Sequence, residues 1–328
     1  MNVLVTGGAG YVGSACLRHL LEHGVNAVAF DNLCMGHRGA VPRERLIVGD
    51  IADGAALRGA LKGVKADAVM HFAAATYVGE SVTDPEYHYR NNIAGTLSLL
   101  NAMRGAGVKR LLFSSTCATY GMNPRVPMAE DSLQDPCSPY ARTKLAVEWM
   151  IRDFAHAYGL GFTLLRYFNA AGASPDGSHG EDHKPENHLI PLVLEVPLGK
   201  RGHITVFGND YQTQDGTCIR DYVHTEDLAQ AHRLAIQATS EKTTEVFNIG
   251  TGNGNSVVEV IRACEQVVGK PIKFQMTERR PGDPPALVAD PAKLKGKLGW
   301  KPRYTDIKSV VETAWKWHST HPDGYADR

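Results

Sequence analysis

The chain has 328 residues, of which 43% are hydrophobic and 21% charged, with 35 basic and 35 acidic side chains. This length predicts one large α/β domain with a smaller companion, and the neutral charge balance argues against a nucleic-acid or membrane partner. The six cysteines include no CxxC pair, and the 14 histidines form no grouping of the zinc-site kind. We therefore expect free thiols, no metal and a cytoplasmic protein with neither an export signal nor a membrane span.

Short apolar runs alternate with longer amphipathic stretches in the first half of the chain. We expect strands at residues 3–5, 25–30, 46–48, 68–72, 110–114 and 162–166, and helices at about 11–22 and 140–158. This alternation is typical of a parallel sheet with crossover helices. Six strands that alternate with helices in this way predict a doubly wound, Rossmann-type sheet.

The regular alternation of strands and helices ends after Asn169, where a turn-rich connection at residues 173–178 leads into mixed elements. We predict a first domain over residues 1–171 and a smaller mixed α/β lobe over residues 172–328. Two strand-like runs at 219–223 and 245–250 flank a helix at about 226–238. Parts of residues 219–250 can therefore rejoin the first sheet.

Three glycines, Gly7, Gly10 and Gly13, directly follow the first strand and open the first helix with Tyr11 and Val12. Without Cβ atoms, such a loop lets a pyrophosphate approach the backbone, and the positive end of the helix receives its charge. A glycine-rich turn without a ligand is the simpler alternative, but the strand before and the helix after favour a dinucleotide site. The first domain is thus predicted to bind a dinucleotide.

Asp31 ends the second strand, where an acidic side chain binds the adenosine ribose hydroxyls of such a cofactor. A carboxylate there repels an added 2′-phosphate, so NAD is favoured over NADP. An ordinary turn aspartate is the alternative. The other expected contacts, for which simple packing is the alternative, are Asn32, Asp50, Ile51, Phe72, Ala73 and Ala74.

Tyr140 and Lys144 lie four residues apart at the start of a predicted helix, so both side chains face the same ligand. A nearby ammonium lowers the pKa of a phenol from its usual value of about 10, which makes the pair a general base for a sugar hydroxyl. Alone, this spacing usually marks a surface pair. Combined with the glycine loop and the hydroxyl-rich strand end that includes Thr116, it predicts an active site.

Together these features resemble the extended short-chain dehydrogenase/reductase family, and within it the group of UDP-glucose 4-epimerases. The likeness covers the whole chain. It is carried by residues 7–14, 31–33, 71–74, 78–81, 138–144, 165–169, 207–211, 215–224 and 279–283. The last three segments look like the UDP-binding segments of that group and are the specific part of the likeness.

The resemblance implies a reaction and a set of roles. Tyr140 would remove the proton of the sugar 4-hydroxyl while C4 delivers a hydride to tightly held NAD, and the 4-keto sugar would turn and take it back on its other face. Thr116 would hydrogen-bond the sugar, and Lys144 would also hold the nicotinamide ribose. Asn91 and Phe168 would be further cofactor contacts. In the homodimer that is usual for the family, the helix after Glu86 and the helix of Tyr140 pack into a four-helix interface.

The resemblance also implies the contacts of the UDP-hexose substrate, which are Asn169, His188, Leu189, Phe207, Arg220, Tyr222, Arg280, Asp283 and Leu287. Guanidinium groups suit a diphosphate because they match its oxygens bidentately. For Arg220, the alternative to diphosphate binding is a surface ion pair with Asp215 or Asp221. For Arg280 it is competition with the adjacent Arg279, since both cannot face the ligand.

Several positions depart from the family pattern. Thr76 stands where other members carry a cofactor-contacting lysine, and His188 replaces an asparagine. Leu287 is intermediate between a large tyrosine, which restricts the pocket to unacetylated hexoses, and a small residue, which admits N-acetylated ones.

The alternatives differ in how well the sequence excludes them. Cys117 and Ala118 follow Thr116 in place of the acid–base pair of 4,6-dehydratases, which argues against dehydration. Epimerisation of UDP-uronates or UDP-N-acetylhexosamines stays open. A catalytically silent NAD-binding sensor is the alternative from a different class, and the intact Tyr140 and Lys144 disfavour it.

Overall fold

A seven-stranded sheet lies at the centre of the computed structural model, which describes residues 1–122, 125–280 and 283–326. Its neighbouring strands run parallel in the order β10-β6-β5-β4-β1-β2-β3. The strands are β1 (Asn2–Thr6), β2 (Asn26–Asp31), β3 (Leu46–Val48), β4 (Ala68–His71), β5 (Arg110–Thr116), β6 (Gly161–Tyr167) and β10 (Thr244–Ile249). This doubly wound order, with its switch point between β1 and β4, confirms the predicted fold class.

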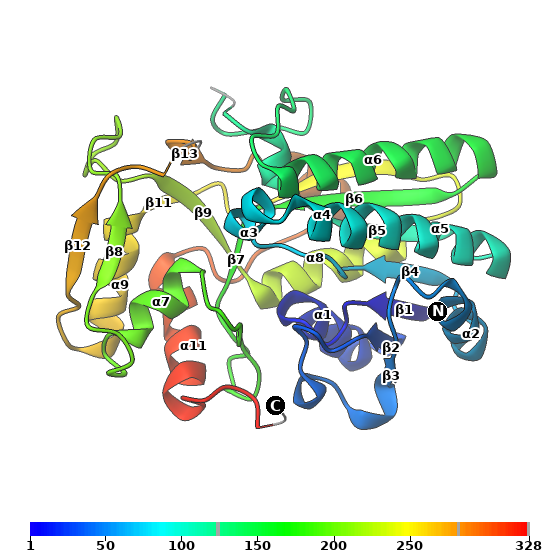
Figure 1. The fold of residues 1–328 in the computed structure, drawn as a ribbon, viewed down its shortest axis with the longest axis horizontal. Coiled ribbons are helices and arrows are strands. Elements are labelled where there is room, and N and C mark those ends of the chain that lie inside the picture. Colours follow the sequence, from blue (N-terminus) through cyan, green and yellow to red (C-terminus); the bar gives the residue numbers. More distant parts are fainter. Residues whose placement is uncertain (123–124, 281–282, 327–328) are drawn as a thin grey trace.

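Helices cover both faces of this sheet (Figure 1). One face carries α1 (Tyr11–Glu22), α8 (Thr225–Ala238) and α10 (Ala292–Leu298), and the other α2 (Gly54–Val64), α5 (Gly95–Ala106) and α6 (Pro139–Tyr158). In β1, Val3 and Val5 belong to the first core and Leu4 to the second, as the two-residue period of a strand requires. Burial on both faces explains why these strands read as continuous apolar runs.

Local sequence sets both ends of α6, the helix that carries the predicted catalytic pair. The Ser138 hydroxyl accepts a hydrogen bond from the backbone N–H of Ala141, and Pro139 fits the first turn because its missing N–H would have no partner there. Gly159 ends the helix at φ 68°, a left-handed conformation that suits glycine. The helix thus begins one residue before the predicted start.

A smaller lobe, called the C-terminal lobe below, is built on a four-stranded and a two-stranded sheet. The first contains β7 (Asn169–Ala171), β9 (Ile219–His224), β11 (Gly254–Ser256) and β13 (Ala286–Leu287), and the second β8 (Ile204–Phe207) and β12 (Phe274–Thr277). The helices α7 (Leu189–Glu195), α9 (Val257–Val268) and α11 (Ile307–Thr320) share its core. A capping box between Ser256 and Glu259 fixes the start of α9.

Two strands near the lobe boundary were harder to place from sequence. The large sheet has seven strands rather than six because β10 pairs in parallel with β6. The neighbouring strand β9 does not rejoin this sheet and pairs with β7, β11 and β13 instead. The helix between them, α8, packs on the core shared with α1, so the chain crosses from the small sheet to the large one through this helix.

Three short helical segments precede α5. They are α3 (Val78–Thr83), α4 (Pro85–His88) and the π-helical turn η3 (Tyr89–Ala94). The six cysteines all carry free thiols, as expected. Among the described residues, no helix combines the length and the hydropathy needed to cross a membrane.

Candidate active site

The glycine loop packs tightly against the loop that follows β4. Gly7 has φ +70°, and a Cβ atom built on it would lie 2.4 Å from the backbone nitrogen of Ala73. A Cβ on Gly13 would lie 2.1 Å from the Gly7 carbonyl oxygen. Gly10 caps α1 and has no side chain that could accept a hydrogen bond from the first N–H groups of that helix. The loop therefore has the shape and the positive helix end that a pyrophosphate needs.

Polar side chains gather where β2 and β3 end beside this loop. The buried Asp31 carboxylate accepts hydrogen bonds from the backbone N–H groups of Ala9 (2.9 Å) and Leu33 (2.8 Å). Burial raises its pKa, and these two bonds act in the opposite direction. The Asn32 amide donates to Asp50 at 2.8 Å. The structure thus brings three predicted cofactor residues to one sheet edge, with Asp31 oriented by backbone donors.

The remaining predicted cofactor positions divide into backbone and packing roles. Phe72 and Ala73 both donate backbone hydrogen bonds to the Thr6 carbonyl, which fixes the loop after β4, and Ala74 follows as a partly buried residue. Ile51 is buried and lies close to Gly95 of α5.

Tyr11 and Asn91 show how neighbouring loops are tied to this edge. The Tyr11 hydroxyl donates to the Gly172 carbonyl at 2.5 Å. Asn91 donates to Asn92 (3.0 Å), which itself bonds to the Ala75 backbone and to Thr143 of α6. Asn92 therefore ties the loop after β4 to α6, a role that the sequence did not reveal.

Tyr140 and Lys144 lie on one face of α6, with Thr116 at the end of β5. Burial raises the pKa of Tyr140 to about 12, while a bond with the Thr116 hydroxyl acts in the lowering direction. Burial lowers the pKa of Lys144 to about 7, and Glu148 opposes this effect. The pKa of Tyr140 is thus raised, not lowered as the sequence led us to expect. Burial dominates, and the Lys144 ammonium donates to the Ser114 carbonyl at 2.9 Å.

A buried ion pair between Glu148 and Arg166 lies next to this site. Glu148 continues the face of Tyr140 and Lys144 by one more helical turn, and its oxygens accept Arg166 Nε (2.8 Å) and Nη2 (2.5 Å). Ser115, next to Thr116, donates to the same carboxylate at 2.5 Å. This network locks α6, β5 and β6 together. The repeated four-residue spacing was a signal that could have revealed Glu148.

Two arginines in the C-terminal lobe take different positions. Arg220 is buried and pairs with Asp283, while its Nη1 donates to the Ile219 carbonyl at 2.7 Å. The suggested pairing with Asp215 or Asp221 is therefore wrong. Ser256 and Thr217 bond the first carboxylate, and Thr251 and the backbone N–H of Ala289 bond the second.

The two adjacent arginines in the same part of the chain contact different aromatic rings. Arg280 stacks over Phe207, with its guanidinium carbon 3.9 Å from the ring centroid. Arg279 instead stacks over Tyr211 and pairs with Asp210. Pro281 and Gly282, which belong to the same predicted segment, lie outside the described residues.

Leu287 relates the small sheet to the segment that follows Thr116. It is the register partner of Arg220 in the small sheet, and it belongs to one apolar cluster with Phe168 and Cys117. Because Cys117 directly follows Thr116, the predicted selectivity residue lies near the predicted catalytic hydroxyl.

The other predicted substrate residues lie on β7, on β9 and at the start of α7. Asn169 and Tyr222 are register partners in β7 and β9, but the Tyr222 ring is buried in the core of the C-terminal lobe. Leu189 starts α7 and packs against that core. His188 Nδ1 lies 2.7 Å from Glu181, whose charge raises the pKa of His188 to about 10 against the effect of burial.

Residues 3–250 match the family model described as the NAD dependent epimerase/dehydratase family. The chain belongs to this family. NAD is accordingly its cofactor, and the glycine loop, which any added Cβ at Gly7 or Gly13 would fill, fits it.

Members of the epimerase/dehydratase family with curated functions align over the full chain. A UDP-glucose 4-epimerase of Halalkalibacterium halodurans is 49% identical over 99% of this chain and 98% of its own length, and one of Streptomyces lividans is 49% identical over the same shares. A crystal structure of UDP-glucose 4-epimerase from Brucella ovis in complex with NAD superposes with a TM-score of 0.93, at 47% identity over 96% of this chain and 97% of that one. The Bifidobacterium longum enzyme in complex with NAD+ and UDP gives 0.94, at 36% identity over 99% and 100%.

Proposed function

We propose that this epimerase-family chain interconverts UDP-glucose and UDP-galactose by inverting C4 of the hexose. One observation carries the proposal. Leu287 shares an apolar cluster with Cys117, which follows Thr116, and is paired in register with Arg220. This supports a single site that combines the hydroxyls of Thr116 and Tyr140 with the cationic segment of the C-terminal lobe. The full-length likeness to UDP-glucose 4-epimerases supports the same activity.

The proposed mechanism needs few protein groups. Tyr140 accepts the proton of the sugar 4-hydroxyl and later returns it, while Thr116 hydrogen-bonds the same hydroxyl. NAD, when bound, supplies reversible oxidation at C4. Lys144 holds the nicotinamide ribose and, when protonated, stabilises a Tyr140 phenolate. Because the pKa of Tyr140 is raised to about 12, chiefly by burial, a positive charge beside the phenol is what this base requires.

The cofactor contacts are proposed along the edge described above. Gly7, Gly10 and Gly13 with the start of α1 receive the pyrophosphate, and Asp31 accepts the adenosine ribose hydroxyls with its remaining lone pairs. The other proposed contacts are Tyr11, Val12, Asn32, Asp50, Ile51, Phe72, Ala73, Ala74, Asn91 and Phe168.

UDP is proposed to bind between the two lobes, which we divide at residues 171 and 172. Arg220 and Arg280 are assigned to the diphosphate and Asp283 to the uridine ribose. Since Asp283 pairs with Arg220 here, it also orients that guanidinium. The other proposed contacts are Asn169, His188, Leu189, Phe207, Tyr222 and Leu287.

A homodimer is the proposed assembly. Apolar side chains of the segment from α3 to α5 and of α6 are unusually exposed, including Val82 at 64% and Trp149 at 58%. Helices that present such residues together bury them when two copies pack. Light scattering should give the mass of a dimer, and Trp149→Glu should shift it toward the monomer. We also propose that the protein works in a reducing, cytoplasmic compartment, where its six free thiols persist.

The activity is tested by incubating the purified chain separately with UDP-galactose, UDP-N-acetylgalactosamine and UDP-galacturonate and separating the product isomers. Epimerised UDP-galactose is the expected result, and turnover of the other two defines the substrate range. No turnover of any of the three would refute an enzymatic function. Tyr140→Phe should keep the bound dinucleotide, seen in its ultraviolet spectrum, and lose about 10²-fold or more in kcat. Unimpaired activity of that variant would remove Tyr140 from the mechanism.

A further inference from the structure

Four potential metal ligands converge in the segment that leads into α7. One polar atom each of Glu181, His183, Glu186 and His188 lies within 4.8 Å of all the others. The spacing of these residues along the chain matches none of the common zinc motifs, so the group is apparent only in the folded segment.

The distances within this group resemble those around a metal ion. His188 Nδ1 lies 2.7 Å from a Glu181 oxygen and 3.1 Å from a Glu186 oxygen. His183 Nδ1 lies 3.1 Å and 3.8 Å from oxygens of the same two carboxylates. A tetrahedral cation with bonds of about 2.1 Å separates its ligand atoms by about 3.4 Å. The four observed N···O separations bracket that value.

The charges of the group also favour a cation. The Glu181 and Glu186 side chains are only 4% and 10% exposed, and among the described residues their ion pairs are with imidazoles. Buried carboxylates need compensating positive charge. A divalent cation held between the two carboxylates supplies that charge.

Surrounding hydrogen bonds hold the ligands in place, as is usual around protein metal sites. Trp317 Nε1 donates to the Glu181 carbonyl at 2.9 Å, and a Glu186 oxygen accepts the backbone N–H groups of Asn187 (2.8 Å) and His188 (2.9 Å). The Tyr77 hydroxyl donates to the Pro185 carbonyl at 3.0 Å.

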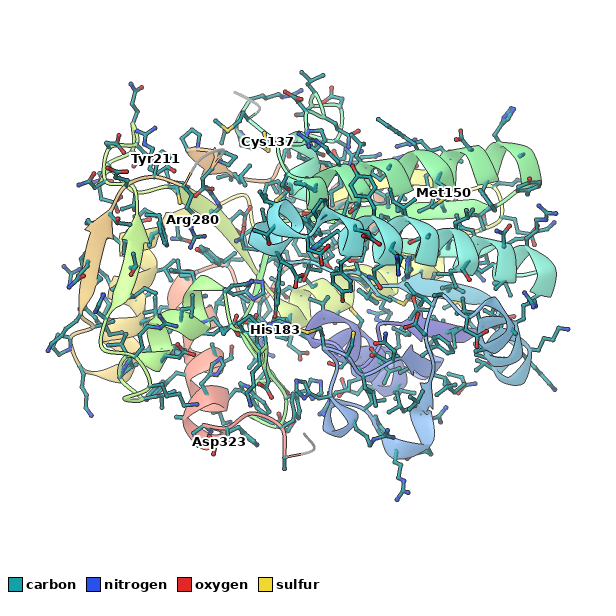
Figure 2. All side chains as sticks on the ribbon, viewed as in Figure 1. Cys137, Met150, His183, Tyr211, Arg280 and Asp323 are labelled. Atoms are coloured by element: carbon teal, nitrogen blue, oxygen red, sulfur yellow. The ribbon has the colours of Figure 1, made fainter. Side chains whose placement is uncertain are left out.

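The group lies where the segment meets the glycine loop. The rings of Tyr11 and Tyr77 stand edge-on to His183 at 6.1 Å and 6.2 Å. Figure 2 labels His183 between the C-terminal lobe and the region of α1.

We propose that Glu181, His183, Glu186 and His188 form a binding site for one divalent transition-metal cation, of which Zn²⁺ is the type. Imidazole nitrogens and carboxylate oxygens are ligands that Zn²⁺ accepts in tetrahedral geometry. The bound ion holds the segment that carries His188 against Tyr11 and Tyr77, and so links the C-terminal lobe to the glycine loop. It takes no part in the reaction at C4.

The test uses the full-length protein, stripped with a chelator, and Zn²⁺ alone as the ligand in titration calorimetry. A Cys34→Ser, Cys137→Ser background removes the exposed thiols as competitors. One equivalent of Zn²⁺ should bind, and His183→Ala and Glu181→Gln should each weaken binding roughly 10-fold or more. The matched control is His23→Ala, which disrupts the exposed group of His19, Glu22 and His23. It should leave the equivalent in place.

Two results would overturn the proposal. One is substoichiometric binding to the unmutated site, and the other is binding that His183→Ala does not weaken. Co²⁺ absorption of the unmutated site keeps the test decisive if a variant does not fold. Strong visible absorption of tetrahedral Co²⁺ is expected, and the weak spectrum of the hydrated ion would show that the group is an ion-pair cluster only.

Discussion

Replacing Glu148 by glutamine should strongly destabilise the protein, because the change removes one charge of a buried pair. Glu148 and Arg166 are 1% and 2% exposed, and two hydrogen bonds of 2.8 Å and 2.5 Å join them. In Glu148→Gln the guanidinium keeps the Tyr120 hydroxyl (3.0 Å) and the Glu130 carbonyl (3.1 Å) as partners but loses its counter-charge. Breaking a buried pair in this way costs about 3–5 kcal/mol. We expect the lower end, about 3 kcal/mol, because the glutamine oxygen still accepts one hydrogen bond.

Urea unfolding followed by circular dichroism measures this loss. With an m value of about 3 kcal/mol per M, the midpoint should fall by about 1 M. The matched control is Glu241→Gln, whose partner Lys109 is 3.5 Å away and where both side chains are at least half exposed. That change should cost less than about 1 kcal/mol. If Glu148→Gln unfolds within about 1 kcal/mol of the unmodified protein at an unchanged m value, the buried pair does not stabilise the fold and the reasoning fails.

Three further outcomes are expected. Gly7→Ala should abolish retention of NAD during purification, since its Cβ would lie 2.4 Å from the Ala73 nitrogen. The control Gly59→Ala, whose Cβ would meet no described atom within 4 Å beyond its chain neighbours and the backbone of α2, should keep NAD and stabilise α2 by about 0.4–1 kcal/mol. Retained NAD in Gly7→Ala would contradict the close approach. Burial lowers the pKa of His224 to about 3, so this ring stays neutral in the fold while the unfolded chain protonates it below about pH 6.5. Its contribution to the free energy of unfolding therefore falls as the pH drops from 6.5, by about 2 kcal/mol at pH 5. Unfolding titrations at pH 6.5 and pH 5 should show a smaller loss of this free energy in His224→Gln than in the exposed control His203→Gln. Leu287→Ala should raise kcat/KM for UDP-N-acetylgalactosamine relative to UDP-galactose about 10-fold, and an unchanged or lower ratio would exclude Leu287 from selectivity.

Much of the fold could be predicted because its signals are local. Residues 11–22 form the predicted helix α1, and residues 46–48 form the predicted strand β3. Hydrophobic periodicity and the glycine spacing report such elements directly, since both depend only on neighbouring residues. The same holds for the glycine loop, whose chemistry follows from three missing side chains between one strand and one helix.

The site was harder to predict wherever partners lie far apart in sequence. Arg220 and Asp283 are separated by 63 residues, and nothing in either segment favours this pair over the nearby Asp215 or Asp221. Similarly, only the packing of β8 shows that Arg280, not Arg279, lies over Phe207.

The sequence by itself determined the order of elements, the position of the glycine loop and the pairing of Tyr140 with Lys144 on one helical face. Only the tertiary structure decided which sheet β9 and β10 join, what compensates the charge of Glu148, and the direction of the Tyr140 pKa. The physical reason is that periodicity is set by neighbours within one or two turns, whereas burial, and the desolvation that accompanies it, is set by whatever distant segment covers a side chain.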